Sequence, residues 1–189
     1  MFSMQHFSLP TRLLDWTESF ACAVFFAQFG RKPKDAASIW ALDPSKLNKL
    51  ACGREALLTL GGDSPGPKLF DTPLWHPGVV PPETPLETVA VVPVYTNPRM
   101  VQQRARFTLM GDSFLPLDEQ WGGELTRSGH LRKIVLPPET FDEAEDFLHL
   151  AGVDAFSFFP DIQGLGLKHK ARVEGDIRFA RRHDPRLFK

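Results

Sequence analysis

The stretch 61–87 constrains the fold more than any other part of the chain, because it holds seven prolines and four glycines. Proline removes a backbone N–H group and glycine weakens regular elements, so neither a helix nor a strand is expected there. The stretch also carries four large apolar residues that a flexible linker rarely contains, Leu69, Phe70, Leu74 and Trp75. We therefore predict a long loop pinned to the protein body. Loops of this length are uncommon and often functional.

The rest of the composition is that of a folded protein with an ordinary surface. Of the 189 residues, 42% are hydrophobic and 24% are charged, and the net charge is -1. These values predict one domain with a sizeable core and no general attraction to nucleic acid or membranes. Cys22 and Cys52 belong to no CxxC pair, so a reducing compartment is expected. The longest apolar run, residues 20–27, is too short to span a membrane, and no signal-peptide pattern follows Met1. A cytoplasmic protein without a membrane partner is therefore expected.

Periodicity and capping residues predict an α+β fold in a single domain, with a mixed sheet of about five strands. A buried helix is expected over residues 18–30, which are apolar all round and follow Thr17 and Ser19 as candidate N-caps. A second helix is expected over 139–153, where Thr140 and Glu143 form the pattern of a capping box. The remaining elements are expected as strands over 37–43, 88–96, 106–110, 131–137 and the start of 154–170, and as helices over 44–53 and after Asn97.

The segment "QHFSLPTRLLDWT", residues 5–17, concentrates polar and aromatic side chains around one proline. The proline stiffens the approach, so we predict a turn over "TRLLDW" that leads into the helix. Within such a turn, Arg12 and Asp15 are close enough to pair. The alternative is a ligand site, in which the helix end and the Arg12 guanidinium hold a phosphate or pyrophosphate. His6 would then donate a proton, or a hydrogen bond to a sugar hydroxyl.

This segment resembles the opening motif of the FRG domain, a family of mostly bacterial and phage proteins. The family pattern is close to Q-H-Y-G-L-P-T-R-L-L-D-W-T followed by a helix with A-x-x-F-A, and Phe7 and Ser8 are the departures here. Two later segments are similar to the same family. They are "NPRMVQQRARFTLMG", with Asn97, Arg99, Gln103, Phe107 and Thr108, and "FFPDIQGLG", with Phe159, Pro160, Asp161 and Gly164.

The resemblance also implies a division of the chain. It places an FRG-like domain over residues 1–167 and leaves a basic tail over residues 168–189. The Phe-Arg-Gly segment that gives the family its name is expected well upstream of the Gln-His pair, whereas only "MFSM" precedes that pair here. The domain is therefore expected to be truncated at its N-terminus relative to the family.

The candidate site residues fall into two groups, assigned by chemical type and by the matching motif positions. Catalytic roles are predicted for His6, Arg12 and Asp161. Ligand-binding roles are predicted for Gln5, Thr11, Asp15, Trp16, Arg99 and Gln103. A structural role in the turn stays open for Asp15 and Trp16, and turn chemistry also fits Asp161. The histidines show no metal-ligand spacing, so no metal is predicted.

Two classes of function stay open. The first is an enzyme acting on a phosphate-bearing, nucleotide-like ligand, for which NAD-dependent ADP-ribosyl transfer is the closest chemistry. NAD would then be a substrate, and no cofactor is predicted. The second is a non-catalytic module for a protein partner or for nucleic acid, because residues 168–189 hold eight Lys or Arg against three acids. The family resemblance implies a mobile-element or defence setting and does not choose between the classes.

Overall fold

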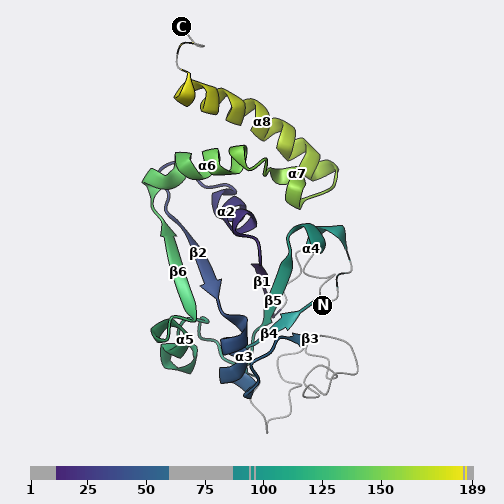
Figure 1. The fold of residues 1–189 in the computed structure, drawn as a ribbon, viewed down its shortest axis with the longest axis vertical. Coiled ribbons are helices and arrows are strands. Elements are labelled where there is room, and N and C mark those ends of the chain that lie inside the picture. Colours follow the sequence, from purple (N-terminus) through teal and green to yellow (C-terminus); the bar gives the residue numbers. More distant parts are fainter. Residues whose placement is uncertain (1–11, 60–86, 94, 96, 185, 187–189) are drawn as a thin grey trace. The chain divides into compact units, whose positions relative to one another are not determined.

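The computed structural model describes residues 12–59, 87–93, 95, 97–184 and 186 (Figure 1). The predicted loop, apart from Glu87, lies outside the described residues. The predicted α+β class is confirmed, since the described residues form helices, a four-stranded sheet and a two-stranded sheet. The chain divides into two compact units, each built from three separate segments. Unit 1 comprises Met1–Trp16, Trp40–Thr96 and Ala105–Arg132, and unit 2 comprises Thr17–Ile39, Asn97–Arg104 and Lys133–Lys189.

The four-stranded sheet belongs mainly to unit 1 and has the strand order β1, β5, β4, β3. The strands are β1 (Leu13–Thr17), β5 (Ala105–Leu109), β4 (Val89–Val92) and β3 (Leu58–Thr59). β3 pairs with β4 in parallel, with Leu58 opposite Val91, and β4 pairs with β5 antiparallel, with Val91 opposite Phe107. The sheet is therefore mixed, as predicted.

The segment "TRLLDW", predicted as a turn, mostly forms strand β1 instead. The N–H of Met110 donates to the carbonyl oxygen of Arg12 at 2.8 Å, which joins the start of β1 to the end of β5. The turn prediction was wrong because β1 is held by a partner strand far along the chain. Strand formation depends on such packing partners more than on local residue preferences.

The two-stranded sheet pairs β2 (Ala37–Leu42) with β6 (Leu131–Leu136), both close to their predicted positions. Their arrows point in opposite directions in Figure 1. Just beyond the pair, the N–H of Asp43 donates to the carbonyl oxygen of His130 at 2.7 Å. Unit 1 continues from here into α3 (Pro44–Cys52), which starts at Pro44 and ends at Gly53 in a left-handed conformation, as the sequence predicted.

The core of unit 1 gathers apolar side chains from its sheet, from α3 and from the short helical stretch η2 (Gln120–Gly123) and α5 (Glu124–Arg127). Its buried members are Leu47, Ala90, Leu117, Leu125 and Leu131, with Trp16, Trp40, Leu42 and Trp121 packed against them. One buried polar residue, Asn48 on α3, makes three hydrogen bonds to backbone groups. Its side-chain nitrogen donates to the carbonyl oxygens of Ala56 at 2.7 Å and Ala90 at 2.9 Å, and its oxygen accepts from the Ala90 N–H at 2.7 Å.

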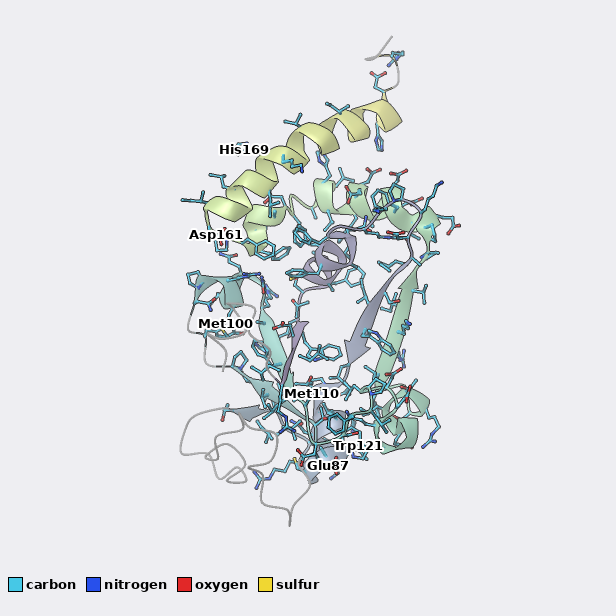
Figure 2. All side chains as sticks on the ribbon, turned by 180° about the vertical axis from the view of Figure 1, so that it is seen from behind. Glu87, Met100, Met110, Trp121, Asp161 and His169 are labelled. Atoms are coloured by element: carbon cyan, nitrogen blue, oxygen red, sulfur yellow. The ribbon has the colours of Figure 1, made fainter. Side chains whose placement is uncertain are left out.

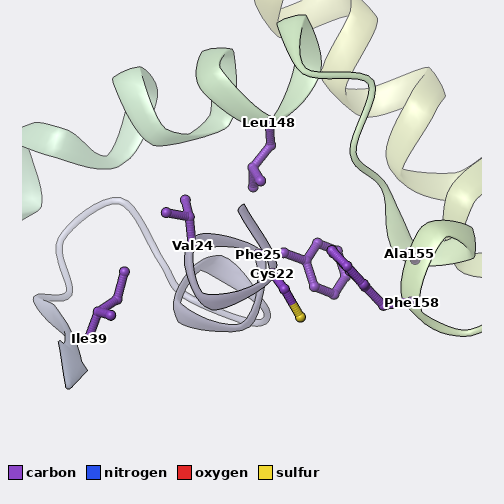
Figure 3. Packing of buried hydrophobic residues seen from close by; sticks show 7 residues of the cluster. All are labelled: Cys22, Val24, Phe25, Ile39, Leu148, Ala155 and Phe158. Carbon is purple, nitrogen blue, oxygen red and sulfur yellow. The ribbon is translucent and has the colours of Figure 1, made fainter. Parts of the chain in front are cut away.

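Unit 2 is mainly helical. Its helices are α2 (Phe20–Gln28), α4 (Pro98–Gln102), η3 (Pro138–Thr140), α6 (Phe141–Leu150), α7 (Ala155–Phe158) and α8 (Ile162–His183). Its buried core is shown in Figure 3 and consists of Cys22, Val24, Phe25, Ile39, Leu148, Ala155 and Phe158. Helix α2 contributes one face to this core, while Phe20 and Phe26 are exposed. Ser19 is its N-cap, one of the two predicted candidates, and accepts from the Cys22 N–H at 3.3 Å.

The residues after Asp154, predicted to begin as a strand, form helices α7 and α8 instead. Asp154 and Ser157 make a reciprocal capping box, in which each side chain accepts from the other residue's N–H, at 3.1 and 3.2 Å. The aromatic run in "AFSFF" favoured a strand, but this cap starts a helix. The predicted boundary between residues 167 and 168 falls inside α8 and stays a prediction.

The capping box predicted for Thr140 and Glu143 is wrong. Thr140 makes no side-chain cap hydrogen bond to α6, and its hydroxyl donates to the carbonyl oxygen of Pro137 at 2.8 Å. The reason is the 3₁₀ turn η3, which precedes α6 directly and places Thr140 inside a helical turn. A side chain there is no longer at the extended N-cap position that a capping box requires.

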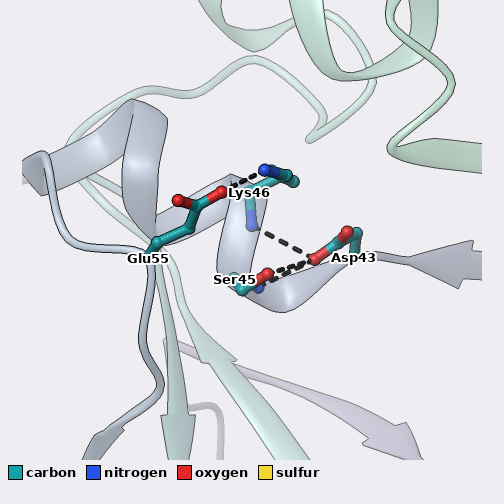
Figure 4. Close-up of polar contacts among 4 residues, drawn as sticks. All are labelled: Asp43, Ser45, Lys46 and Glu55. Atoms are coloured by element: carbon teal, nitrogen blue, oxygen red, sulfur yellow. Dashed lines mark hydrogen bonds and ion pairs between the residues drawn. The ribbon is translucent and has the colours of Figure 1, made fainter.

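Asp43 at the start of α3 provides a test of stability against pH (Figure 4). Its Oδ1 accepts from the Ser45 hydroxyl at 2.7 Å and from the N–H groups of Ser45 and Lys46 at 3.1 and 3.2 Å. The Ser45 hydroxyl bond, followed by the backbone bonds, lowers the pKa of Asp43. We expect Asp43→Ala to lower the free energy of unfolding by about 1 kcal/mol near neutral pH.

The sign of the pH dependence follows from the lowered pKa. Since the folded pKa lies below the unfolded value of about 3.9, the stabilisation is present above that value and is lost as pH falls through the folded pKa. Urea unfolding at about pH 7 and about pH 3 should therefore show the difference between wild type and Asp43→Ala shrinking in acid. A difference that stays constant or grows would contradict this account. Ser45→Ala is the control, because it removes the main cause of the pKa shift.

Candidate functional site

Arg12 lies just before β1 and its side chain binds within unit 1. Its Nε donates to the carbonyl oxygen of Met110 at 3.0 Å, and its Nη2 pairs with Oδ1 of Asp112 at 3.0 Å. The predicted pairing of Arg12 with Asp15 is wrong, because side chains three residues apart along an extended strand point to opposite faces. The guanidinium therefore fastens the start of β1 to the segment after β5.

Trp16 has the structural role that the sequence left open. Its indole N–H donates to Oγ1 of Thr108 on the neighbouring strand β5 at 3.1 Å, and its ring packs against the core of unit 1. Asp15 is exposed on β1. Gln5, His6 and Thr11, three of the predicted site residues, lie outside the described residues. Their catalytic and ligand-binding roles stay predictions.

Three segments that are far apart in the sequence meet within unit 2, and each belongs to one of the three family-like motifs. The hydroxyl of Thr17 donates to the carbonyl oxygen of Gln103 at 2.7 Å. The side-chain nitrogen of Gln103 then donates to the carbonyl oxygen of Phe158 at 3.2 Å. Figure 2 labels Met100 on α4 and Asp161 before α8, on two of these segments. Gln103, predicted as a ligand-binding residue, thus links the first motif to the last.

Beside these hydrogen bonds lies a set of four side chains that we call the aromatic–arginine cluster, Phe26, Phe29, Arg99 and Phe159. The guanidinium carbon of Arg99 lies 4.2 Å from the ring centroid of Phe159. The Phe159 ring centroid lies 5.9 Å from that of Phe26, edge to face, and 6.1 Å from that of Phe29. Such spacings are those of favourable aromatic and cation–π contacts. Phe26 is 42% exposed and Phe29 52% exposed, so the cluster reaches the surface of unit 2.

Asp161, predicted as a catalytic carboxylate, caps α8. Its Oδ1 accepts from the N–H of Gly164 at 2.8 Å, and its carbonyl oxygen accepts from the N–H of Leu165 at 3.0 Å. The side chain is exposed, so solvent reaches the carboxylate. The turn chemistry that the sequence suggested for Asp161 is therefore present. Its catalytic role stays a prediction.

The cysteine in the core of unit 2 is not an activated nucleophile. Burial raises the pKa of the Cys22 thiol, and a hydrogen bond with Thr17 offsets this only in part. A thiol needs a lowered pKa to react readily near neutral pH. In the part of the chain that the structure describes, no cluster of His, Cys, Asp and Glu could hold a metal ion. Among the described residues, no helix is both long and apolar enough to cross a membrane.

Two members of the aromatic–arginine cluster, Phe26 and Phe29, were missed as site residues in the sequence. The sequence feature that could have identified them is the excess of phenylalanine in "FFAQF". We interpreted these phenylalanines as buried residues of a helix. A helix with one buried face cannot cover all of these rings. Arg99 was predicted as a ligand-binding residue of the second motif, and this role stays a prediction, while its aromatic partner Phe159 was not predicted as a site residue.

Comparison with known proteins relates part of this chain to a protein family. The family model of the FRG domain matches residues 1–36. That range covers the opening motif, β1 and α2, including Phe26 and Phe29. No curated protein and no solved structure matches the chain. The N-terminal segment of this chain, residues 1–36, thus matches the FRG domain, which bears out the resemblance seen in the opening motif.

Proposed function

We propose that this FRG-domain protein binds a phosphate-bearing, nucleotide-like ligand at the aromatic–arginine cluster. The observation that carries the proposal is Arg99 stacked 4.2 Å over the Phe159 ring, with the partly exposed rings of Phe26 and Phe29 beside it. Monomeric proteins have little reason to hold a cation and several phenylalanines together at their surface unless a ligand or partner covers them.

The cluster suits the two parts of a nucleotide. A base has an apolar face that stacks on aromatic side chains, which is worth about 1–3 kcal/mol per base. A guanidinium can stack on a ring with its flat face and bind a phosphate through the N–H groups at its edge. Arg99 is already ordered on Phe159, so binding would lose less side-chain entropy than with a free arginine. Phe26 or Phe29 would then take the base.

The catalytic extension of the proposal is ADP-ribosyl transfer from NAD. In that reaction the bond between the nicotinamide nitrogen and ribose C1′ breaks, nicotinamide leaves, and a nucleophile that gives up a proton takes the ADP-ribosyl group. The sequence assigned the acid–base and charge-stabilising roles to His6, Arg12 and Asp161 by chemical type alone, and each of these roles stays a prediction. Binding at the cluster does not depend on this extension.

The experiment is calorimetric titration of the full chain with ADP, ATP and NAD. We expect at least one of them to bind, and Arg99→Ala and Phe26→Ala each to weaken binding by about tenfold or more. Arg99→Lys should recover little, because lysine keeps the charge but loses the planar stack. Arg132→Ala and Phe114→Ala are the matched controls, since both residues are exposed and lie outside the cluster.

Two results would contradict the proposal. One is no binding of any of the three nucleotides, and the other is equal weakening by the cluster variants and their controls. Release of nicotinamide from NAD, followed by chromatography, tests the catalytic extension separately. Nucleotide binding without nicotinamide release would identify a non-catalytic binding module.

A further inference from the structure

Helix α8 has two faces with opposite environments. On one side Gly164 is buried and Leu167 packs against the core of unit 2, and Lys168 pairs with Asp154 at 3.0 Å. The other side exposes four aliphatic residues, Ile162, Leu165, Val173 and Ile177. They lie close to whole turns of the helix from one another, so they form one line along it. We call this line the aliphatic stripe. Ile162 is 91% exposed and Val173 is 64% exposed, while Leu165 and Ile177 are partly covered, so the stripe is largely open within the described part of the chain.

The charge of α8 complements an anionic surface. Between Ile162 and His183 the sequence has six Lys or Arg against two Asp or Glu, in a protein whose net charge is only -1. Lys170 is exposed near the middle of the helix. A helix that joins an apolar line to a surplus of basic residues has the composition of helices that lie in a membrane interface.

We propose that α8 lies on anionic phospholipid membranes, with the aliphatic stripe at the level of the acyl chains and the exposed Lys170 among the headgroups. A second copy of the chain fits less well, because it would bring two basic helices together. Single-stranded nucleic acid fits less well too, because it binds aromatic side chains interleaved with basic ones, and the stripe is aliphatic. A partner that wraps around a free helix is excluded by the packing of Gly164 and Leu167. A flat membrane surface contacts only the exposed side of α8, so the packing of the other side does not prevent it from binding.

The test is sedimentation of the full chain with vesicles made of equal parts phosphatidylcholine and phosphatidylglycerol. We expect binding that weakens with added salt, and little binding to vesicles of phosphatidylcholine alone. The double variant Val173→Ser with Ile177→Ser should lower the vesicle partition coefficient by about tenfold or more. Both residues are exposed, so the variant should keep its fold, which circular dichroism checks. Leu150→Ser is the matched control, an exposed aliphatic residue on α6.

Three outcomes would overturn the proposal. The first is no binding to the anionic vesicles. The second is binding that the double variant leaves unchanged, since the stripe would then take no part. The third is tighter binding to a DNA or RNA oligonucleotide than to vesicles, with no effect of the double variant, which would identify α8 as a nucleic-acid element.

Discussion

Gly164→Ala is expected to lower the free energy of unfolding by about 3 kcal/mol or more. A Cβ atom at this position would clash with the carbonyl oxygen of Phe159 and would lie 2.7 Å from its Cβ. The atoms it meets belong mostly to the backbone, which cannot move aside as the end of a flexible side chain can. The first turn of α8 would have to shift away from Phe159, and the Asp161 cap would be lost with it.

The matched control for this substitution is Gly166→Ala, two residues along the same helix. A Cβ at Gly166 would have no neighbour within 4 Å. Because alanine has the higher helix propensity, this variant should gain about 0.5–1 kcal/mol. Urea unfolding followed by circular dichroism compares the two variants with wild type. Similar effects of the two substitutions would mean that the close approach of Gly164 to Phe159 does not exist in solution.

Asn48→Ala, in unit 1, is expected to lower the free energy of unfolding by about as much as Gly164→Ala does. The substitution removes three hydrogen bonds and leaves the carbonyl groups of Ala56 and Ala90 and the N–H of Ala90 without this partner. Asn48 is fully buried, and so are its two bonds to Ala90, so water cannot replace these two bonds without opening the core. Each unsatisfied buried group costs about 1–3 kcal/mol, so a loss of about 3 kcal/mol or more follows.

Asn97→Ala provides the comparison for Asn48→Ala. The Asn97 side chain also bonds to backbone, accepting from the Met100 N–H at 2.9 Å as the N-cap of α4, but it is only half-buried. Its loss should therefore cost about 1 kcal/mol, the usual value for an N-cap. Urea unfolding monitored by tryptophan fluorescence measures both. Equal costs for the two asparagines would show that the buried network around Asn48 is not formed.

Elements with a local signal could be predicted from the sequence. Helix α3 has Asp43 before Pro44 at its start and Gly53 after its end, and α4 has Asn97 as its cap, so both were placed correctly. Strand β1 was not predicted, because it forms by pairing with the distant strand β5. Helix α7 was not predicted either, because it starts at a capping box that lies within a run of aromatic residues. Asn48 gave no signal either, because an asparagine in a helix is expected to face solvent rather than a strand backbone.

The candidate site was predictable only in its outline. The motif matches selected Arg99, Gln103 and Asp161, and the structure brings their segments together in unit 2. What could not be predicted is how each polar group is used. Arg12, Gln103 and Asp161 all bind groups of their own chain, and these contacts depend on the three-dimensional arrangement rather than on residue type.

The segments of the two units alternate along the chain, and this order affects folding during synthesis. Strands β4 and β5 are neighbours in unit 1, yet the segment that joins them, Asn97–Arg104, belongs to unit 2. No single cut can therefore release one unit whole, and neither unit is complete while the ribosome is still adding its last segment. Unit 1 needs residues up to Arg132, and unit 2 needs α8. Contacts between such distant segments slow folding, so neither unit can finish folding before its own last segment has left the ribosome.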